Sequence, residues 1–305
     1  MKKTTLFKQL IEAEEILIAP GIFDGITARL VQAMGFKSGT ISGAGISNSR
    51  LGKPDFGLLG LTDNVDQCRN LANCVDIPLQ ADADTGYGNA VNVFHTVQAF
   101  EQAGVAAVMI EDQVWPKRCG HMQGVQVIPA RDMVKKIEAA VAARRDPDFC
   151  IKGRTNAAPV HGIDEALRRA NLYADAGADV LYADAILSRE DIKRFAGETK
   201  KPVMINMGFG IRQRPTTPLL SPRELQKMGV AAVVYPRILS SAAVCGMRKA
   251  LEVLLESAKT GEIYDRPDLT VDFKELTDLM GLPEMQALEK QFLTDEALSD
   301  KYGKA

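Results

Sequence analysis

Residues 78–113 read PLQADADTGYGNAVNVFHTVQAFEQAGVAAVMIEDQ, and the order of its apolar and polar residues indicates the fold class. Two short apolar runs, 78–86 and 106–113, flank a segment in which apolar residues recur with the period of an amphipathic helix. Gly104 stands just past that segment, where a glycine commonly ends a helix. A strand, a helix and a second strand in this order indicate two parallel strands joined by a right-handed crossover.

The same unit repeats along the chain. Further apolar runs bring the number of predicted strands to eight: 16–21, 39–45, 149–157, 180–186, 202–208 and 231–237. Helical stretches lie between them, and Gly177 and Gly229 again precede a strand. Eight such units in 305 residues predict a closed (β/α)8 barrel of the TIM type. An open doubly wound sheet is the alternative, but no GxGxxG motif follows the first run to support it.

The residues after about 240 continue as helical sequence, including KALEVLLESAK at 249–259. No linker rich in proline or serine divides the chain. We therefore predict a single barrel domain over residues 1–305. Within it, residues from about 240 to 305 supply the last barrel helix and a C-terminal helical extension that packs on a partner subunit.

Composition narrows the class of protein. Hydrophobic residues make up 46% and charged residues 25% of the chain, as in a globular protein with a large core. The formal net charge of -2 and the lack of a long Lys/Arg run predict no binding to nucleic acid or to a membrane surface. Charges interrupt the first apolar stretch, which excludes a signal-peptide core and favours a cytoplasmic protein. Five cysteines without a CxxC pair predict free thiols, explained by packing at four of the five positions.

Each predicted strand begins with apolar residues and ends in polar or glycine-rich sequence. In a parallel barrel these ends share one rim, and active sites of this fold lie there. The residues concerned are Asp24, Ser42, Gly43, Asp82, Asp84, Glu111, Asp112, Arg154, Asp184, Asn206 and Arg237.

A metal site is predicted at this rim. Asp82 and Asp84 are two residues apart on a predicted strand, so their carboxylates are expected to project to the same face. Glu111, at the end of the next strand, can approach from the side. Mg2+ prefers a few carboxylates together with water, whereas three histidines without ligand spacing disfavour zinc. A solvated strand end is the alternative, and the position of the pair beside Glu111 favours the metal.

Arg154, at the end of the fifth strand, carries a guanidinium fork that suits a carboxylate or a phosphate. A structural salt bridge to a neighbouring acid of the rim is the alternative interpretation.

Residues 111–124 read EDQVWPKRCGHMQG, and their proline and glycines argue against a helix. Cys119 lies at the centre of this stretch. Its basic neighbours are Lys117, Arg118 and His121. Cationic neighbours favour a thiolate and let a thiol exchange a proton near neutral pH, so Cys119 is the one cysteine predicted to be reactive.

Four motifs occur in order along the chain: ADADTGYGN (81–89), IEDQ (110–113), KRCGH (117–121) and GRTNA (153–157). With them the sequence resembles the isocitrate lyase/phosphoenolpyruvate mutase superfamily, and within it the methylisocitrate lyase and 2,3-dimethylmalate lyase branch. The resemblance runs from about APGIFDGITARL (19–30) to the end of the barrel. It implies a homotetramer with exchanged C-terminal helices.

The resemblance also implies a set of site residues. For Mg2+, with Mn2+ as a substitute, it implies Asp82, Asp84 and, in the outer network, Glu111. For a dicarboxylate substrate it implies Ser42, Gly43, Ala44, Gly120, Arg154 and Asn206. For catalysis it implies Cys119, Lys117, His121, Arg154 and Asp55.

The reaction implied is the cleavage of a substituted malate or methylisocitrate-type 2-hydroxy dicarboxylate to a 2-oxo acid, such as pyruvate, and a carboxylate. Cys119 protonates the carbanion from a mobile loop that shuts water out. The alternatives are an oxaloacetate hydrolase or decarboxylase, a phosphonomutase-type activity on the same site, a Schiff-base aldolase that uses Lys152, and a non-catalytic binding barrel.

The chain departs from the family's pattern at several positions. Thr40 stands where some methylisocitrate lyases have a tyrosine, so the group that takes the hydroxyl proton is not assigned. Asp184 replaces a glutamate, and Asn156 stands where the lyases commonly have an acid. Lys152 stands where the family has an apolar residue, and it is predicted to pair with a rim carboxylate such as Asp184.

The loop after the seventh strand, NMGFGIRQRPTTPLL (206–220), differs from both lyase branches. It adds Arg212 and Arg214, which are expected either to meet an additional anionic group of the substrate or to pair with acids of a neighbouring subunit.

Overall fold

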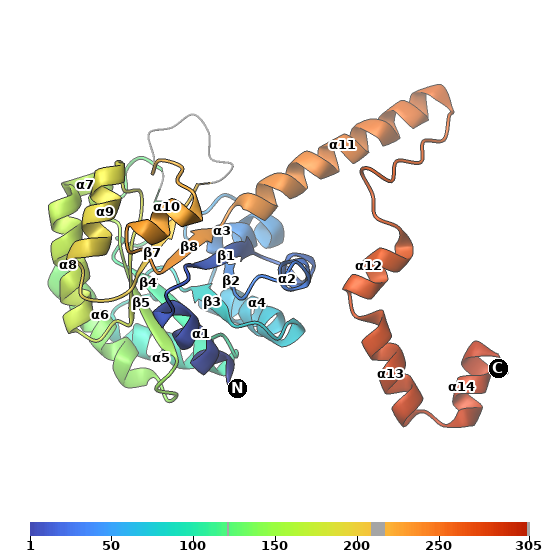
Figure 1. Ribbon diagram of the computed structural model, residues 1–305, viewed down its shortest axis with the longest axis horizontal. Coiled ribbons are helices and arrows are strands. Elements are labelled where there is room, and N and C mark those ends of the chain that lie inside the picture. Colours follow the sequence, from blue (N-terminus) through green and yellow to red (C-terminus); the bar gives the residue numbers. More distant parts are fainter. Residues whose placement is uncertain (121, 209–216, 304–305) are drawn as a thin grey trace. The chain divides into compact units, whose positions relative to one another are not determined.

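The structure, a computed structural model, describes residues 1–120, 122–208 and 217–303. Within these ranges eight parallel strands follow one another in chain order and close into a barrel (Figure 1). They are β1 Leu17–Ile22, β2 Gly39–Ile41, β3 Leu79–Asp82, β4 Ala107–Glu111, β5 Cys150–Thr155, β6 Val180–Ala183, β7 Val203–Asn206 and β8 Ala232–Tyr235. β1 pairs with both β2 and β8, which completes the circle. The predicted (β/α)8 barrel is confirmed.

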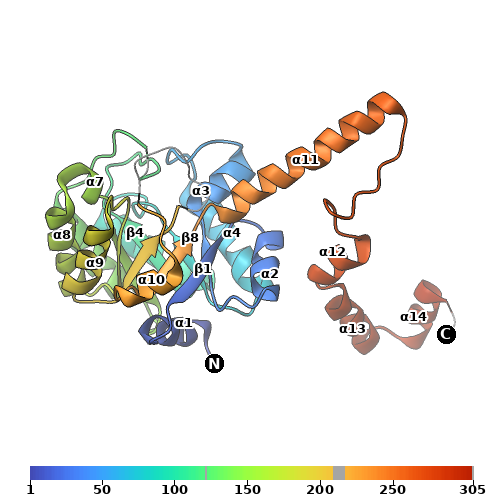
Figure 2. The ribbon, with the colours of Figure 1, turned by 45° about the horizontal axis from the view of Figure 1, so that its top comes forward.

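One helix precedes the first strand, and further helices connect the strands (Figure 2). They are α1 Lys3–Glu12, α2 Gly25–Ala33, α3 Gly43–Ile46, the π-helix Ser47–Leu51, α4 Leu61–Cys74, α5 Ala90–Gln102, α6 Ala130–Ala143, α7 Ala158–His161, α8 Ile163–Asp175, α9 Arg189–Glu198 and α10 Pro222–Lys227. Gly104, Gly177 and Gly229 follow the ends of α5, α8 and α10 with φ of +87°, +102° and +88°. Their predicted role in ending helices is confirmed, because this left-handed conformation favours glycine.

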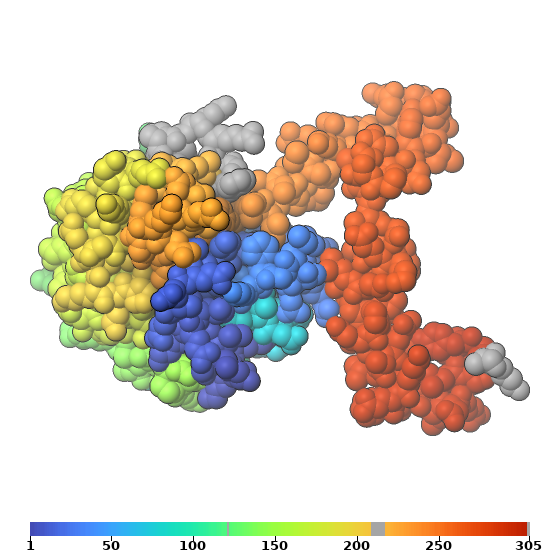
Figure 3. Space-filling model, in the orientation of Figure 1, coloured from blue at the N-terminus to red at the C-terminus, as the bar shows by residue number. Residues whose placement is uncertain are grey.

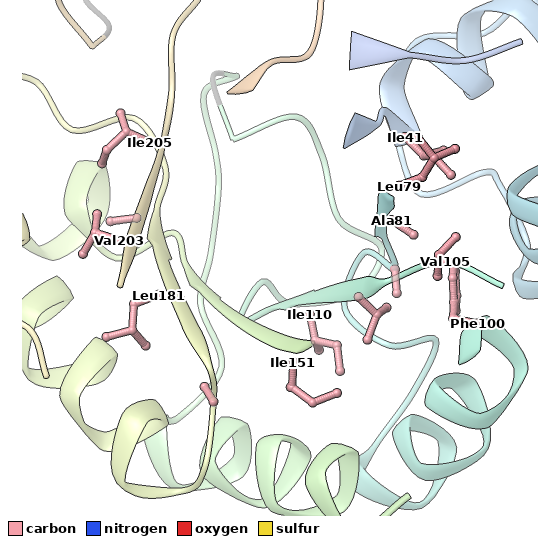
Figure 4. Packing of buried hydrophobic residues seen from close by; sticks show 14 of the residues in the cluster. Ile41, Leu79, Ala81, Phe100, Val105, Ile110, Ile151, Leu181, Val203 and Ile205 are labelled. Carbon is pink, nitrogen blue, oxygen red and sulfur yellow. The ribbon is translucent and has the colours of Figure 1, made fainter. Parts of the chain in front are cut away.

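Strand side chains alternate between two apolar layers. One layer lies between the strands and the surrounding helices, as Figure 4 shows for Ile41, Leu79, Ile151, Leu181 and Val203. The other fills the inside of the barrel and includes Leu17, Ala19, Ala107, Met109, Cys150, Val180, Tyr182, Met204, Ala232 and Val234, with Phe7 and Ile11 of α1. Because α1 and this inner layer occupy the amino end of the barrel, the polar cavity is left at the carboxyl end.

The residues divide into two compact units, Met1–Ser241 and Ala242–Ala305. In Figure 3 the visible surface of the first unit is formed largely by N-terminal residues, in blue, and by residues of about 190–230, in yellow to orange. None of the described helices combines the length and the apolar character needed to cross a bilayer.

The second unit contains most of α11 Ile238–Thr260, and α12 Phe273–Leu279, α13 Leu282–Phe292 and α14 Asp295–Tyr302. Large apolar side chains are exposed in it, with Phe273 at 81% and Phe292 at 71%. Cys245 on α11 is exposed as well. The prediction that packing explains this cysteine is therefore wrong, because α11 carries no buried side chain.

Candidate active site

A cavity opens at the carboxyl ends of the strands, at the rim indicated by the sequence. Its lining includes Thr40, Ser42, Ala44, Asp55, Asp82, Cys119, Gly120, Lys152, Arg154, Asp184, Asn206 and Arg237. Most of the predicted site residues therefore surround one cavity. Asp84, Glu111 and Lys117 are buried and contact residues of its wall.

Asp82 and Asp84 converge at one point of the rim. Asp82 ends β3, and Asp84 lies beyond the strand with a φ of +50°. The Asp84 N–H donates to Oδ1 of Asp82 at 3.0 Å. A Cβ built on Gly43 would lie 3.5 Å from Oδ2 of Asp82 and 3.6 Å from Oδ1 of Asp84. The two carboxylates come together, but a turn places Asp84 there rather than the strand alternation that we expected.

Lys117 lies between two carboxylates. Its Nζ is 2.6 Å from Oδ1 of Asp84 and 2.7 Å from Oδ1 of Asp55, and the side chain is buried. Burial alone lowers the pKa of Lys117, but Asp84 and Asp55 outweigh it and hold that pKa well above its usual value. Burial raises the pKa of Asp84 to about 7, although Lys117 opposes the shift. Lys117 thus ties the loop after β4 to the acids of the rim.

Arg154 is paired with acids on both sides. Its Nε lies 3.0 Å from Oε2 of Glu111, and its Nη2 donates to Oδ2 of Asp184 at 2.5 Å and to Oδ1 of Asn156 at 3.1 Å. Nδ2 of Asn206 donates to Oδ1 of Asp184 at 3.3 Å. Burial lowers the pKa of Arg154, but Asp184 and Glu111 raise it well above the usual value, so the guanidinium is a fixed cation. Arg154 therefore forms structural ion pairs and also lines the cavity.

Glu111 is almost completely buried behind Arg154. Its Oε2 accepts hydrogen bonds from Nδ2 of Asn156 at 2.9 Å and from Nε2 of Gln113 at 3.1 Å. Among the described residues, no group donates a hydrogen bond to its Oε1. Burial raises the pKa of Glu111, and Arg154 opposes that shift.

Hydrogen bonds hold the loop after β4 against Asp55 and Gln113. The Cys119 N–H donates to the carbonyl oxygen of Asp55 at 3.2 Å, and Nε2 of Gln113 donates to the carbonyl oxygen of Arg118 at 2.9 Å. A Cβ on Gly120 would lie 2.9 Å from Nη2 of Arg154 and would overlap a carboxylate oxygen of Asp184. Only a glycine lets the loop backbone come this close to the arginine.

Arg237, just past β8, reaches the thiol from the other side of the cavity. Its Nη2 donates to Sγ of Cys119 at 3.2 Å. From the sequence, Arg237 was predicted only to lie at the polar end of a strand, and no role was assigned to it. Its position just past the end of a barrel strand was the only sequence feature that pointed to the site. The contact itself joins residues 118 positions apart and could not be read from local sequence.

The remaining predicted substrate residues follow β2. Ser42 caps the short helix α3 by accepting from the N–H of Gly45 at 3.1 Å, and Ser42 and Ala44 both line the cavity. Gly43 lies against the two converging carboxylates. His121, Arg212 and Arg214, which the sequence also singled out, lie outside the described residues.

Lys152 does not pair with Asp184, and that prediction is wrong. The side chain is 1% exposed, and Nζ donates to Oε1 of Gln80 at 2.5 Å. Asp184 instead pairs with Arg154, which lies two residues nearer the rim on the same strand. Burial lowers the pKa of Lys152 to about 7.

The donors around Gly43 suit a hard divalent cation. Asp82 and Asp84, which lie against Gly43, offer carboxylate oxygens, and Glu111 at the end of β4 has an Oε1 that is buried without a donor among the described residues. No three His, Cys, Asp or Glu side chains in the described part of the chain lie close enough together to hold a metal by themselves. This arrangement fits Mg2+, which takes one or two carboxylates and keeps several waters.

A family model described as phosphoenolpyruvate phosphomutase matches residues 7–255. The chain belongs to the phosphoenolpyruvate phosphomutase family. Membership confirms the resemblance that the four motifs indicated, and it makes the cavity at the rim the candidate active site of an enzyme.

Curated relatives in this family include lyases. The chain is 38% identical to 2,3-dimethylmalate lyase of Eubacterium barkeri, with 96% of this chain and 99% of the relative aligned. It is 39% identical to 2-methylisocitrate lyase of Aeropyrum pernix, with 89% and 86% aligned. These relatives support the expectation of a carbon–carbon lyase.

Solved structures with the same fold include two hydrolases. Oxaloacetate acetylhydrolase in complex with the inhibitor 3,3-difluorooxalacetate superposes with a TM-score of 0.87 and 29% identity, covering 95% of this chain and 97% of that one. Phosphonopyruvate hydrolase in complex with oxalate and Mg++ has a TM-score of 0.84 and 28% identity, covering 96% and 100%. The same fold thus carries more than one chemistry on 2-oxo acids.

Proposed function

We propose that the protein is a Mg2+-dependent carbon–carbon lyase. It cleaves a substituted malate or methylisocitrate-type 2-hydroxy dicarboxylate to a 2-oxo acid, such as pyruvate, and a carboxylate. The observation that carries the proposal is that the thiol of Cys119 lines the same cavity as Asp82 and Arg154. A proton donor, an oxygen site for a cation and a fixed positive charge are the groups that this cleavage needs.

Substrate binding is divided among the walls of the cavity. Ser42, Gly43 and Ala44 hold the part of the substrate that becomes the 2-oxo acid. Arg154 and Asn206 face a carboxylate. The backbone at Gly120 covers the bound molecule and excludes water when the loop is seated.

Asp82 and Asp84, with Glu111 in the outer network, are the residues that would hold Mg2+ or its substitute Mn2+. When bound, the cation supplies Lewis-acid polarisation of the substrate's oxygens. The carboxylates and the buried, undonated Oε1 of Glu111 support this assignment.

Cys119 delivers a proton to the carbanion that forms when the C2–C3 bond breaks. Lys117 holds the loop in place through Asp55 and Asp84, and His121 belongs to the same catalytic loop. The thiol itself is positioned by Arg237, which contacts Sγ. The loop residues therefore act as one unit on the proton transfer.

The test is a Mg2+-dependent screen of 2-methylisocitrate, 2,3-dimethylmalate, isocitrate, citramalate and oxaloacetate, with detection of the released 2-oxo acid. On the best substrate we expect Cys119→Ser to lose at least about 100-fold in kcat, the scale of a general acid. Cys245→Ser, which changes an exposed thiol, is the control and should retain full activity. Full turnover by Cys119→Ser would overturn the proton-donor role.

Oxaloacetate hydrolysis or decarboxylation is the second candidate. Similarity over nearly the whole chain to an oxaloacetate acetylhydrolase bound to an oxaloacetate analogue favours it over a Schiff-base aldolase activity. Product analysis separates this candidate from the lyase, because hydrolysis gives oxalate and acetate whereas cleavage of a substituted malate gives a 2-oxo acid and a second carboxylate.

We also propose that the protein is a homotetramer in the cytoplasm. The exposed apolar side chains of the second unit, among them Leu254, Phe273 and Phe292, support a partner copy, because monomers rarely leave so many large apolar groups in water. Free cysteines fit a reducing compartment. Sedimentation of the full chain and of a chain ending at residue 241 tests the assembly, and an unchanged association state in the shorter chain would contradict the role of this unit.

A further inference from the structure

The proposed cleavage requires a group that accepts the proton of the substrate hydroxyl. None of the described residues assigned above is free for that step: Asp55 is ion-paired with Lys117, and His121 lies outside the described residues. Arg154 and Lys117 are held as cations by their acid partners, and Asp82 and Asp84 are assigned to the metal. A base must therefore be sought elsewhere on the cavity wall.

Lys152 lies on that wall, one inward-facing step deeper than Arg154 on β5. Met109 is its partner in register on β4, and Met204 and Val234 line the same cavity. It is among the largest fully buried side chains of the described protein. A long basic side chain buried this completely calls for a function, because burial of a charge without a counter-ion is unfavourable.

The only hydrogen-bond partner that the described residues give Nζ of Lys152 is an amide oxygen. Oε1 of Gln80 accepts from Nζ at 2.5 Å. No carboxylate of the described residues forms an ion pair with Lys152, and residues 121, 209–216, 304 and 305 include no Asp or Glu. An amine that donates one hydrogen bond to an amide and lacks a counter-ion keeps a lone pair for the cavity.

We propose that Lys152 is the base that accepts the hydroxyl proton of the substrate in the cleavage step. The inference rests on the proposed lyase function. It assigns a catalytic role to a residue that departs from the apolar pattern expected at this position, and Gln80 becomes its positioning residue.

The electrons and protons of this step balance between Lys152 and Cys119, which line the same cavity. The lone pair of Nζ takes the proton from the C2 hydroxyl, and the O–H electron pair forms the C=O bond of the 2-oxo acid. The C2–C3 bond breaks, its electrons remain on C3, and the Cys119 thiol gives its proton to C3. Lys152 ends as an ammonium and Cys119 as a thiolate, and solvent returns the proton from one to the other after product release.

The surroundings of Lys152 support a base that works near neutral pH. Burial lowers its pKa to about 7, and this lies in the range where a lysine can act as a base. The titratable and charged groups of the described residues that face the amine or line its cavity are Asp55, Asp82 of β3, Cys119 of the loop, Cys150 and Arg154 of β5, Tyr182 of β6, Asp184 and Arg237. Asp82 favours the charged amine, whereas Arg154 disfavours it.

The test compares Lys152→Met with Lys152→Arg in the Mg2+-loaded full chain. Methionine fills similar space without a proton, whereas arginine keeps a positive charge but cannot lose its proton. We expect both variants to lose about 100-fold or more in kcat and to lose the fall in activity that the parent shows below about pH 7. Near-parental activity of Lys152→Arg would show a fixed-charge role and overturn the proposal. So would near-parental activity of Lys152→Met.

A binding measurement keeps the inference separate from the lyase function. Oxalate with Mg2+ is titrated calorimetrically at pH 8 in two buffers of different ionisation enthalpy, which gives the protons taken up on binding. A dianion near the amine favours its protonation, so the parent takes up a proton that Lys152→Met does not. Lys3→Met, which changes a half-buried lysine bonded to the carbonyls of Ala72 and Val75, should match the parent.

The activity screen and the binding measurement together distinguish failure of the lyase proposal from failure of the role of Lys152. If no member of the substrate panel is cleaved but proton uptake depends on Lys152, the lyase proposal fails and the proton-accepting role of Lys152 stands. Uptake that is the same in the parent and in Lys152→Met overturns the inference whatever the substrate. Trapping of pyruvate on Lys152 by borohydride would also overturn it, because the amine would then act as a nucleophile.

Discussion

Arg237 donates a hydrogen bond to the thiol sulfur of Cys119, although 118 residues separate them. The contact joins the end of the last barrel strand to the loop that follows the fourth strand. A guanidinium in this position stabilises the negative charge that the sulfur acquires when its proton leaves. Arg237 is therefore a positioning residue for the proton donor.

We predict that Arg237→Met lowers kcat by about 10-fold to 100-fold, the scale of a lost charge-assisted hydrogen bond. It should also change the rate at which iodoacetamide alkylates Cys119, because the sulfur loses the hydrogen bond that holds it in place. Alkylation is measured in a Cys245→Ser background to remove the exposed thiol. Arg189→Met, which breaks an exposed ion pair with Glu224, is the control, and equal alkylation rates in Arg237→Met and the parent would contradict the role.

Gly120 sets how closely the loop can approach Arg154. We predict that Gly120→Ala lowers kcat at least about 10-fold while the thermal unfolding temperature changes little, because a Cβ there would overlap the carboxylate of Asp184 only when the loop is seated. Gly197→Ala in α9 has open space around the new methyl group and is the matched control. A fully active Gly120→Ala variant would show that the reaction does not need the seated loop.

The barrel could be predicted from the sequence because its signals are local. Apolar runs, helical periods and glycines such as Gly104 and Gly177 depend on neighbours within a few residues, and every predicted strand is present in the structure. The parallel topology alone predicted that the site residues lie together at one rim, because the carboxyl ends of all the strands meet there.

The partners within the site could not be predicted in the same way. Lys152 was expected to meet Asp184, but Arg154 lies nearer the rim and takes that acid, leaving Gln80 for the lysine. Asp84 was expected on a strand and lies in a turn. Which cation pairs with which acid depends on depth inside the barrel, and alternation along a strand gives the face of a side chain but not its partner.

Removal of the metal is predicted to abolish activity. Treatment with EDTA should stop 2-oxo acid release, and Mg2+ should restore it fully and Mn2+ at least in part, because both are hard cations that accept carboxylate oxygens. Asp82→Asn should raise the Mg2+ concentration for half-maximal activity by about 10-fold or more, whereas Asp66→Asn, an exposed change on α4, should not. Activity that survives complete chelation would contradict the metal requirement.

The buried amine of Lys152 predicts a pH dependence of stability. Its pKa is about 7 in the folded protein and takes the usual 10.5 when the chain unfolds. Between these values the unfolded chain binds more protons than the folded one, so the contribution of Lys152 to stability rises with pH across this window. Below about pH 7 both states carry the proton, and the folded protein bears the full cost of the buried charge.

Lys152→Met removes this cost. We predict that the variant is more stable than the parent at pH 6, by on the order of a few kcal/mol, and that its advantage shrinks as the pH rises from 7 towards 10. Urea unfolding at pH 6, 7.5 and 9 measures the difference. Lys135→Met, which changes an exposed lysine paired with Glu138, should show no such trend. An advantage that stays constant with pH would mean that Lys152 does not lose its proton in the folded protein, and the neutral amine that the cleavage step requires would then be absent.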